Sequence, residues 1–213
     1  MSAARKSIDP RKQPVQKRGQ EKVQKIIKAT LQLLRRNHPN SITASLIAAK
    51  AGINIASLYQ FFPNKEAIFN TLFQSWLESI QAGYDRVEEE YLLKTDWRDF
   101  FTRIHEQARE TAYEPEVATA LDYVMAGNPE LTEIDEELGD KLTQRMAGYL
   151  KAYGSTWSEE ELIRLSTLLY EFGWTALYHT AGQSSEAAAQ THEWTLQAVL
   201  GLIETCLHDT TES

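Results

Sequence analysis

The most constraining feature of this sequence is residues 41–70, which read as two short helices separated by a glycine, with a third helix after a proline. Ser41 and Thr43 are the candidate caps of the first helix, and Gly52 is placed to end it because glycine adopts a positive φ at low cost. Asn54 is placed to cap the second helix, whose apolar anchors are Leu58 and Phe62. Two short helices across such a tight turn predict a helix-turn-helix.

The second short helix is the predicted DNA-reading element, because this helix enters the major groove and presents its N-terminal residues to base edges. Glutamine pairs with an adenine edge, and small apolar side chains contact thymine methyl groups. Hydroxyls and lysine suit phosphate oxygens. The predicted DNA-binding residues are Thr43, Asn54, Ile55, Ala56, Ser57, Tyr59, Gln60 and Lys65.

The run from Ile53 to Glu66 resembles the DNA-binding signature of the TetR family of transcriptional regulators. In that signature a Leu-Tyr-x-x-Phe core, here residues 58–62, is followed by a Lys-Glu pair, here residues 65–66. The resemblance covers roughly residues 20 to 70. The family often has a lysine or arginine in the middle of the second helix, where this chain has Ile55 and Gln60.

Charge is distributed unevenly along the chain. Residues 1–70 contain 13 Lys and Arg against 3 Asp and Glu, or +10, and residues 71–213 contain 9 against 27, or −18, which together give −8. Such a split indicates that the first part faces a polyanion. Residues 1–19 are rich in Lys and Arg and read either as an arm for phosphates or the minor groove, or as a solvated tail.

Helical periodicity continues through the rest of the chain, which predicts an all-α protein. An N-terminal three-helix head containing the helix-turn-helix is joined by a long helix, about residues 64–92, to a larger helical body for ligand binding and dimerisation. The predicted domains are a flexible basic tail (1–19), a DNA-binding domain (20–66) and the body (67–213). Further helices are expected near 96–113, 115–126, 131–153, 158–180 and 185–208.

The body is rich in large aromatic side chains, which line many small-molecule sites but also build ordinary cores. The resemblance to the TetR family implies an inducer pocket in this region. A small apolar or amphipathic molecule of unknown identity is the expected effector. The candidate pocket residues are Tyr123, Tyr149 and Trp174.

The last two expected helices carry small residues among large ones. Small residues let helices approach closely, and two helices per chain can form a four-helix bundle across a two-fold axis. The alternative is that both helices close the core of a monomer. The predicted homodimer interface is Leu169, Gly173, Ala176, Leu177, Trp194, Ala198, Gly201, Leu202 and Thr205.

Catalytic and metal-binding patterns are fragmentary. His105-Glu106 begins like a zinc-protease motif, but Arg109 stands where the second histidine is needed. The single Cys206 cannot form an internal disulfide. We therefore expect no catalytic residue, no metal and no cofactor. The sequence has no apolar run long enough for a membrane span and no secretory signal, so a cytoplasmic location is expected.

Together these features predict a sequence-specific DNA-binding transcriptional regulator, a repressor that binds a palindromic operator as a homodimer and is released by its ligand. The alternative is an all-helical ligand-binding or protein-interaction module in which the helix-turn-helix only contributes packing. Replacing Tyr59 or Lys65 by alanine separates the two, because only a DNA-binding protein would lose duplex affinity with its fold intact.

Overall fold

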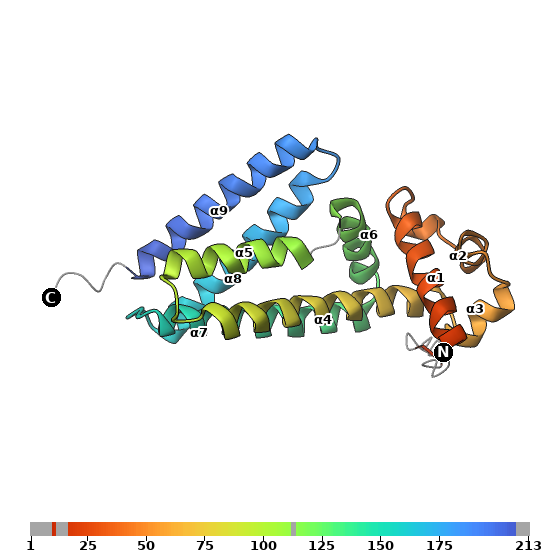
Figure 1. Ribbon diagram of the computed structural model, residues 1–213, viewed down its shortest axis with the longest axis horizontal. Coiled ribbons are helices and arrows are strands. Elements are labelled where there is room, and N and C mark those ends of the chain that lie inside the picture. The colour runs from red at the N-terminus through yellow and green to blue at the C-terminus, as the bar shows by residue number, and fades with distance from the viewer. Residues whose placement is uncertain (1–9, 12–16, 112–113, 208–213) are drawn as a thin grey trace. The chain divides into compact units, whose positions relative to one another are not determined.

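The computed structural model of this protein describes residues 10–11, 17–111 and 114–207. Within these ranges every regular element is a helix, so the predicted all-α class is confirmed (Figure 1). No helix among the described residues has both the length and the apolar character needed to cross a membrane. The elements are α1 (Lys17–Leu34), the 3-10 turn η1 (Pro39–Ser41), α2 (Ala44–Ala51), α3 (Ile55–Phe61), α4 (Lys65–Tyr91), α5 (Trp97–Thr111), α6 (Pro115–Ala126), α7 (Pro129–Ala152), α8 (Glu159–Thr180) and α9 (Ser185–Leu207).

Local capping sets the ends of the two short helices. The Thr43 hydroxyl accepts a hydrogen bond from the Leu46 N–H at the start of α2, and the Asn54 side chain accepts one from the Ala56 N–H at the start of α3. Gly52 ends α2 in the left-handed conformation, with φ of 64°. A side chain with a Cβ would be strained there. The predicted helix-turn-helix is therefore present, with Asn54 as the predicted cap of α3 and Thr43, one of the two candidates, as the cap of α2.

The chain divides into two compact units. The first unit runs as far as Trp76 and also includes Glu116–Leu131, and the second contains Leu77–Pro115 and the chain from Thr132 onward. The first unit, here called the head unit, thus contains α6 as well as the helix-turn-helix. The domain boundaries predicted from the sequence place all residues after 66, and so α6, in the body. The structure places α6 in the head unit instead. Most of the predicted basic tail lies outside the described residues.

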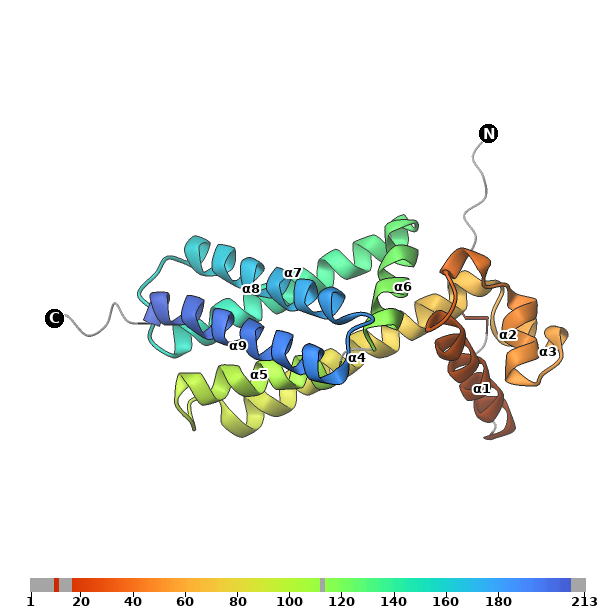
Figure 2. The same ribbon diagram turned by 90° about the horizontal axis from the view of Figure 1, so that it is seen from above.

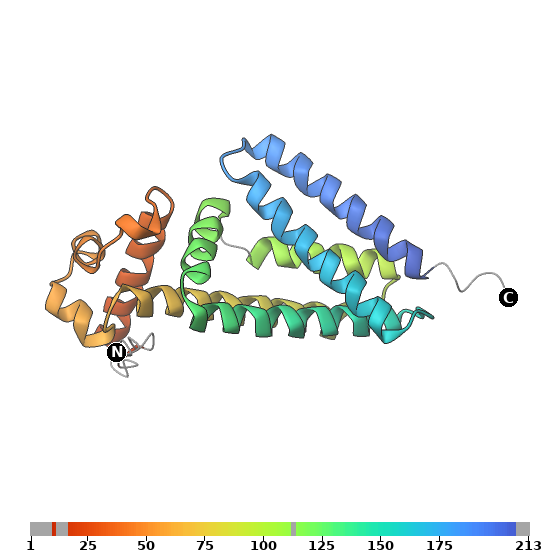
Figure 3. The ribbon, with the colours of Figure 1, turned by 180° about the vertical axis from the view of Figure 1, so that it is seen from behind.

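The head unit has an apolar core of its own. Ile26 of α1, Ile47 of α2 and Leu58 of α3 are fully buried, and Ile42 and Phe62 are buried in the segments next to the short helices. Helix α1 packs on α2, and α2 packs on α3, as seen from behind in Figure 3. Burial of each large apolar side chain contributes roughly 1.5–3 kcal/mol. The amphipathic α1 therefore supports the two short helices.

The second unit, here called the body unit, contains α8 and α9 as an antiparallel pair (Figure 2). Leu162 and Leu169 of α8 and Ile203 of α9 are buried in this unit. Helix α5 packs against α9, and its Phe100 is fully buried. Helix α9 thus packs on both α8 and α5, and buried apolar side chains lie in all three helices.

A polar network joins α4 to α7 inside the body unit. The Arg145 guanidinium pairs with Asp85 at 2.8 Å and with Glu88 at 2.5 Å, and the Tyr149 hydroxyl donates to Glu88 at 2.8 Å. The hydrogen bond from Tyr149 and the ion pair with Arg145 lower the pKa of Glu88. The positive charge of Arg145 on α7 is therefore paired with two carboxylates of α4 within the unit.

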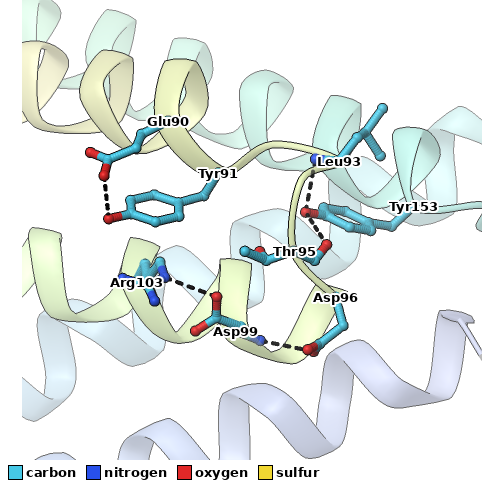
Figure 4. A network of polar contacts seen from close by, with 8 residues as sticks. All are labelled: Glu90, Tyr91, Leu93, Thr95, Asp96, Asp99, Arg103 and Tyr153. Carbon is cyan, nitrogen blue, oxygen red and sulfur yellow. Dashed lines mark hydrogen bonds and ion pairs between the residues drawn. The ribbon is translucent and has the colours of Figure 1, made fainter.

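Tyr153 forms hydrogen bonds with the turn between α4 and α5 (Figure 4). The Tyr153 hydroxyl accepts a hydrogen bond from the Leu93 N–H at 3.1 Å and donates one to the Thr95 carbonyl at 3.4 Å. Leu93 has φ of 57°, an uncommon conformation for a leucine. Arg103 pairs with Asp99 at 2.9 Å on the following helix. The two bonds of Tyr153 hold the turn in a conformation that leucine disfavours.

Candidate nucleic-acid interface

Helix α3 presents one face to the core of the head unit and the other face outward. Leu58 and Phe61 are buried, which sets the rotation of the helix about its own axis. The outward side chains are the exposed Ala56, Tyr59 and Gln60 and the half-buried Ile55 and Ser57. All five belong to the predicted DNA-binding set, and they lie together on the second helix of the helix-turn-helix.

A groove of about 560 Å³ adjoins α3 in the head unit, near the N-termini of α2 and α4. Helix N-termini present unpaired backbone N–H groups with a partial positive charge, which favours phosphate. Three residues assigned to phosphate from the sequence, Thr43, Tyr59 and Lys65, all line this groove. The remaining lining residues are Asn40, Ile42, Ala44, Pro63 and Asn64.

Three of the predicted DNA-binding residues also have roles within the head unit, and the first is Thr43, whose hydroxyl caps α2. The Asn54 Oδ1 accepts from the Ala56 N–H at 2.7 Å, so this carbonyl caps α3. The Lys65 Nζ donates to the Pro39 carbonyl at 3.2 Å, and an ammonium group has three donors in all. Lys65 therefore keeps donor capacity for a phosphate, whereas Asn54 serves the helix itself.

The residues that build this interface match the sequence profile of a known family. Residues 26–72, from α1 to the first turns of α4, match the family described as bacterial regulatory proteins, tetR family. The matched stretch contains the whole helix-turn-helix and the groove beside it.

Solved structures share the fold over most of the chain. A transcriptional regulator from Rhodococcus sp. Rha1 is 18% identical, with 88% of this chain and 96% of that chain covered and a TM-score of 0.70. A TetR-family transcriptional regulator from Marinobacter aquaeolei VT8 is 18% identical, with 87% and 90% covered and a TM-score of 0.66. The fatty acid degradation regulator FadR from Bacillus halodurans is 16% identical, with 95% and 100% covered and a TM-score of 0.63. No curated protein matches the sequence.

The chain therefore carries the DNA-binding domain of the TetR family over residues 26–72. It is a DNA-binding regulator with a helix-turn-helix head, as the sequence predicted.

Arg11 is a residue of this TetR-family head that sequence reasoning missed. Its backbone N–H donates to the Phe61 carbonyl at 2.7 Å, and its guanidinium donates to the Tyr59 carbonyl at 3.3 Å. Both carbonyls belong to the C-terminal turn of α3, where carbonyls lack partners within the helix and a cation is favourable. Arg11 therefore supports the reading helix. No local pattern could have identified it, since its partners are about 50 residues away.

Tyr123 lies in the head unit, although the sequence predicts it in a pocket of the body. Its ring meets His38 edge-on at 4.4 Å, and its hydroxyl accepts a hydrogen bond from the Asn40 side chain at 3.1 Å. It lines a groove of about 510 Å³ together with Phe69 of α4. Tyr123 thus connects α6 with the segment between α1 and α2.

The other two predicted pocket residues lie in the body unit. Tyr149 is 3% exposed, and its ring meets Phe100 edge-on at 5.0 Å. Burial and its hydrogen bond to Glu88 raise the pKa of Tyr149. Trp174 stacks on Tyr178 at 5.7 Å along α8. Tyr149 therefore takes part in the polar network with Glu88. Trp174 lies in a row of aromatic side chains along α8, between Tyr170 and Tyr178.

The predicted dimer residues all lie in the body unit and fall into three groups. Leu169 and Ala176 are buried inside the unit, so they pack within the chain and not on its surface. Two neighbours that the sequence did not select, Leu168 and Phe172, are exposed instead. Leu177 and Leu202 are half-buried, and Gly173, Trp194, Ala198, Gly201 and Thr205 are exposed.

Proposed function

We propose that this chain is a homodimeric repressor that binds a palindromic operator and releases it when a small apolar or amphipathic molecule binds the body. The observation that carries the DNA-binding part is the groove in which Thr43, Tyr59 and Lys65 meet beside the outward face of α3. These groups supply hydroxyls and a cation for phosphate, next to side chains suited to base edges.

Two copies are required by the geometry of the DNA. A single α3 has only two turns, and two heads reading half-sites about one helical turn apart, roughly 34–36 Å, gain the affinity that one head lacks. The proposed contact is the exposed side of α8 and α9, which includes Leu168, Phe172 and Trp194. Its occupant is the same face of a second copy, an isologous pairing that closes after two chains.

Two exposed glycines support this choice of surface. A Cβ added to Gly173 or Gly201 would meet nothing within 4 Å inside the chain. Glycine in a helix interior costs about 0.5–1 kcal/mol relative to alanine. Packing within one chain therefore gives no reason for glycine at these positions, whereas close approach of a partner helix does.

The dimer is tested by sedimentation of Phe172→Glu and Trp194→Ala. We expect both variants to sediment as monomers with unchanged helical content. Leu93→Asn is the matched control, because it also replaces an exposed apolar residue but lies on the α4–α5 turn. A dimer that persists in both variants would contradict the proposed surface.

The effector part of the proposal rests on the aromatic row of α8, Tyr170, Trp174 and Tyr178. Aromatic rings with polar ends are typical of sites for apolar and amphipathic molecules. Such a molecule would lower operator affinity only by preferring the conformation that binds DNA poorly. A metabolite screen against operator binding tests this, with Trp174→Phe as the variant expected to reduce the response.

The DNA-binding part is tested by selecting bound duplexes from a random pool with the full-length protein. We expect one enriched palindrome with half-sites about one helical turn apart. A reporter gene placed downstream of that palindrome should be silenced by the wild-type chain and active with Tyr59→Ala. Activation of the reporter by the wild-type chain would contradict repression and leave DNA binding intact.

A further inference from the structure

Helix α3 has an unusual chemical composition for a DNA-reading helix. Its sequence, Ile-Ala-Ser-Leu-Tyr-Gln-Phe, contains no charged residue at all. Guanine is most often read by an arginine or lysine that binds O6 and N7, and cytosine by a carboxylate that accepts from N4. Helix α3 therefore lacks the side chains that read G·C pairs best.

The helix does present the groups that read A·T pairs. Ala56 and Gln60 are both exposed and stand four residues apart, so they share one face of the helix. A methyl side chain suits the thymine C5-methyl group, and a glutamine amide pairs with adenine N6 and N7. Ile55, half-buried at the first position of α3, adds a second apolar group at the end of the helix that meets base edges.

The remaining polar groups near this face are engaged elsewhere. The Asn54 Oδ1 caps α3 through the Ala56 N–H, so Asn54 cannot bind adenine with both amide atoms without opening the helix start. Tyr59 lines the phosphate groove with Lys65, and the Lys65 ammonium contacts the Pro39 carbonyl. Base reading by α3 is thus left to Ile55, Ala56 and Gln60, with Ser57 able to bond to any base.

We infer that the operator bases facing α3 are A·T pairs, with thymine methyl groups against Ile55 and Ala56 and an adenine edge against Gln60. This inference rests on the proposed function, because it specifies the DNA that the same interface selects. Ile55 and Ala56 discriminate against G·C pairs by leaving the polar edges of those pairs without partners, which is a penalty and not an added attraction.

The test uses the full-length protein and the duplexes enriched from a random pool at fixed salt. A·T pairs should occupy the central positions of each half-site. Replacing their thymines by uracil removes only the C5-methyl group, and we expect affinity to fall about fourfold per buried methyl. In Ile55→Ser the cost of the same replacement should shrink, because the apolar partner is gone.

A specificity change gives the sharpest check. Gln60→Ala should bind the operator at least about fivefold more weakly and accept other bases at one position. Gln60→Arg should restore binding when that position is changed from adenine to guanine. A wild-type half-site with G·C pairs opposite α3, or uracil that binds as well as thymine, would overturn the inference while the proposed DNA binding stands. A pool without any enriched sequence would overturn both.

Discussion

The head unit and the body unit use their polar side chains in opposite ways. In the head, Thr43, Tyr59 and Lys65 line an open groove, and the outward face of α3 remains accessible. In the body, Arg145 is only 24% exposed and is shared between two carboxylates of α4. Polar groups of the head therefore line an open groove, whereas the body uses its own to join helices. Counted by unit, the head contains 13 Lys and Arg against 6 Asp and Glu, or +7, and the body contains 9 against 24, or −15.

The largest effect should come from removing the anchor of the reading helix. Leu58 is fully buried, so Leu58→Ala should destabilise the head unit by about 2–5 kcal/mol. We expect operator binding to be lost while sedimentation still shows a dimer, because the proposed dimer surface lies in the body unit. Leu46→Ala is the control, since Leu46 is exposed on α2. Loss of the dimer in Leu58→Ala would show that the head unit stabilises the body.

A smaller effect is expected from breaking the polar network of the body. Arg145→Ala leaves Glu88 and Asp85 without their cation, and we expect a loss of roughly 2–3 kcal/mol, below the range for fully buried pairs because both carboxylates are partly exposed. Denaturant unfolding measures the loss. Lys141→Ala, which breaks an exposed pair with Glu137, should change stability by less than about 1 kcal/mol. Equal losses of stability in the two variants would contradict the idea that the partly buried network joins α4 to α7 more strongly than an exposed ion pair would.

The salt dependence of operator binding should change when a lysine of the head is removed, but not when a lysine of the body is removed. Lys65→Ala should weaken operator binding about tenfold and lower the slope of log affinity against log salt by about 0.9, as expected for one lost phosphate contact. The same slope should be unchanged in Lys151→Ala, which removes an exposed lysine from α7 of the body. Titrations at four salt concentrations distinguish the two. An unchanged slope in Lys65→Ala would remove this lysine from the phosphate contacts.

The smallest effect is a pH dependence located in the body. Burial lowers the pKa of His105, and the neighbouring His192 and Arg109 lower it further. The unfolded chain therefore binds a proton at His105 at a higher pH than the folded chain does, so stability is lost as pH falls below about 6.5. Thermal unfolding between pH 7.5 and 5.5 should show a shallower decline for His105→Gln than for the wild type. A parallel decline in both would place the titrating group elsewhere.

Much of the interface could be predicted because its signals are local. The caps Thr43 and Asn54 and the left-handed Gly52 act on backbone groups within a few residues, so their types and spacing define the two short helices. The spacing of apolar residues predicted α4 and the later helices. Periodicity could not choose between adjacent leucines, and it selected Leu169 where Leu168 is the exposed one. A small change in helix rotation decides which neighbour faces the core.

The sequence by itself determined the all-α class, the helix-turn-helix and the basic head, because these depend on capping, periodicity and composition. Only the tertiary structure decided that Arg11 supports α3 and that Arg145 joins α4 to α7. It also decided that Tyr123 belongs to the head unit. Each of these contacts joins residues about 50 to 80 positions apart. Their partners are chosen by how the packed helices meet, which no local pattern records.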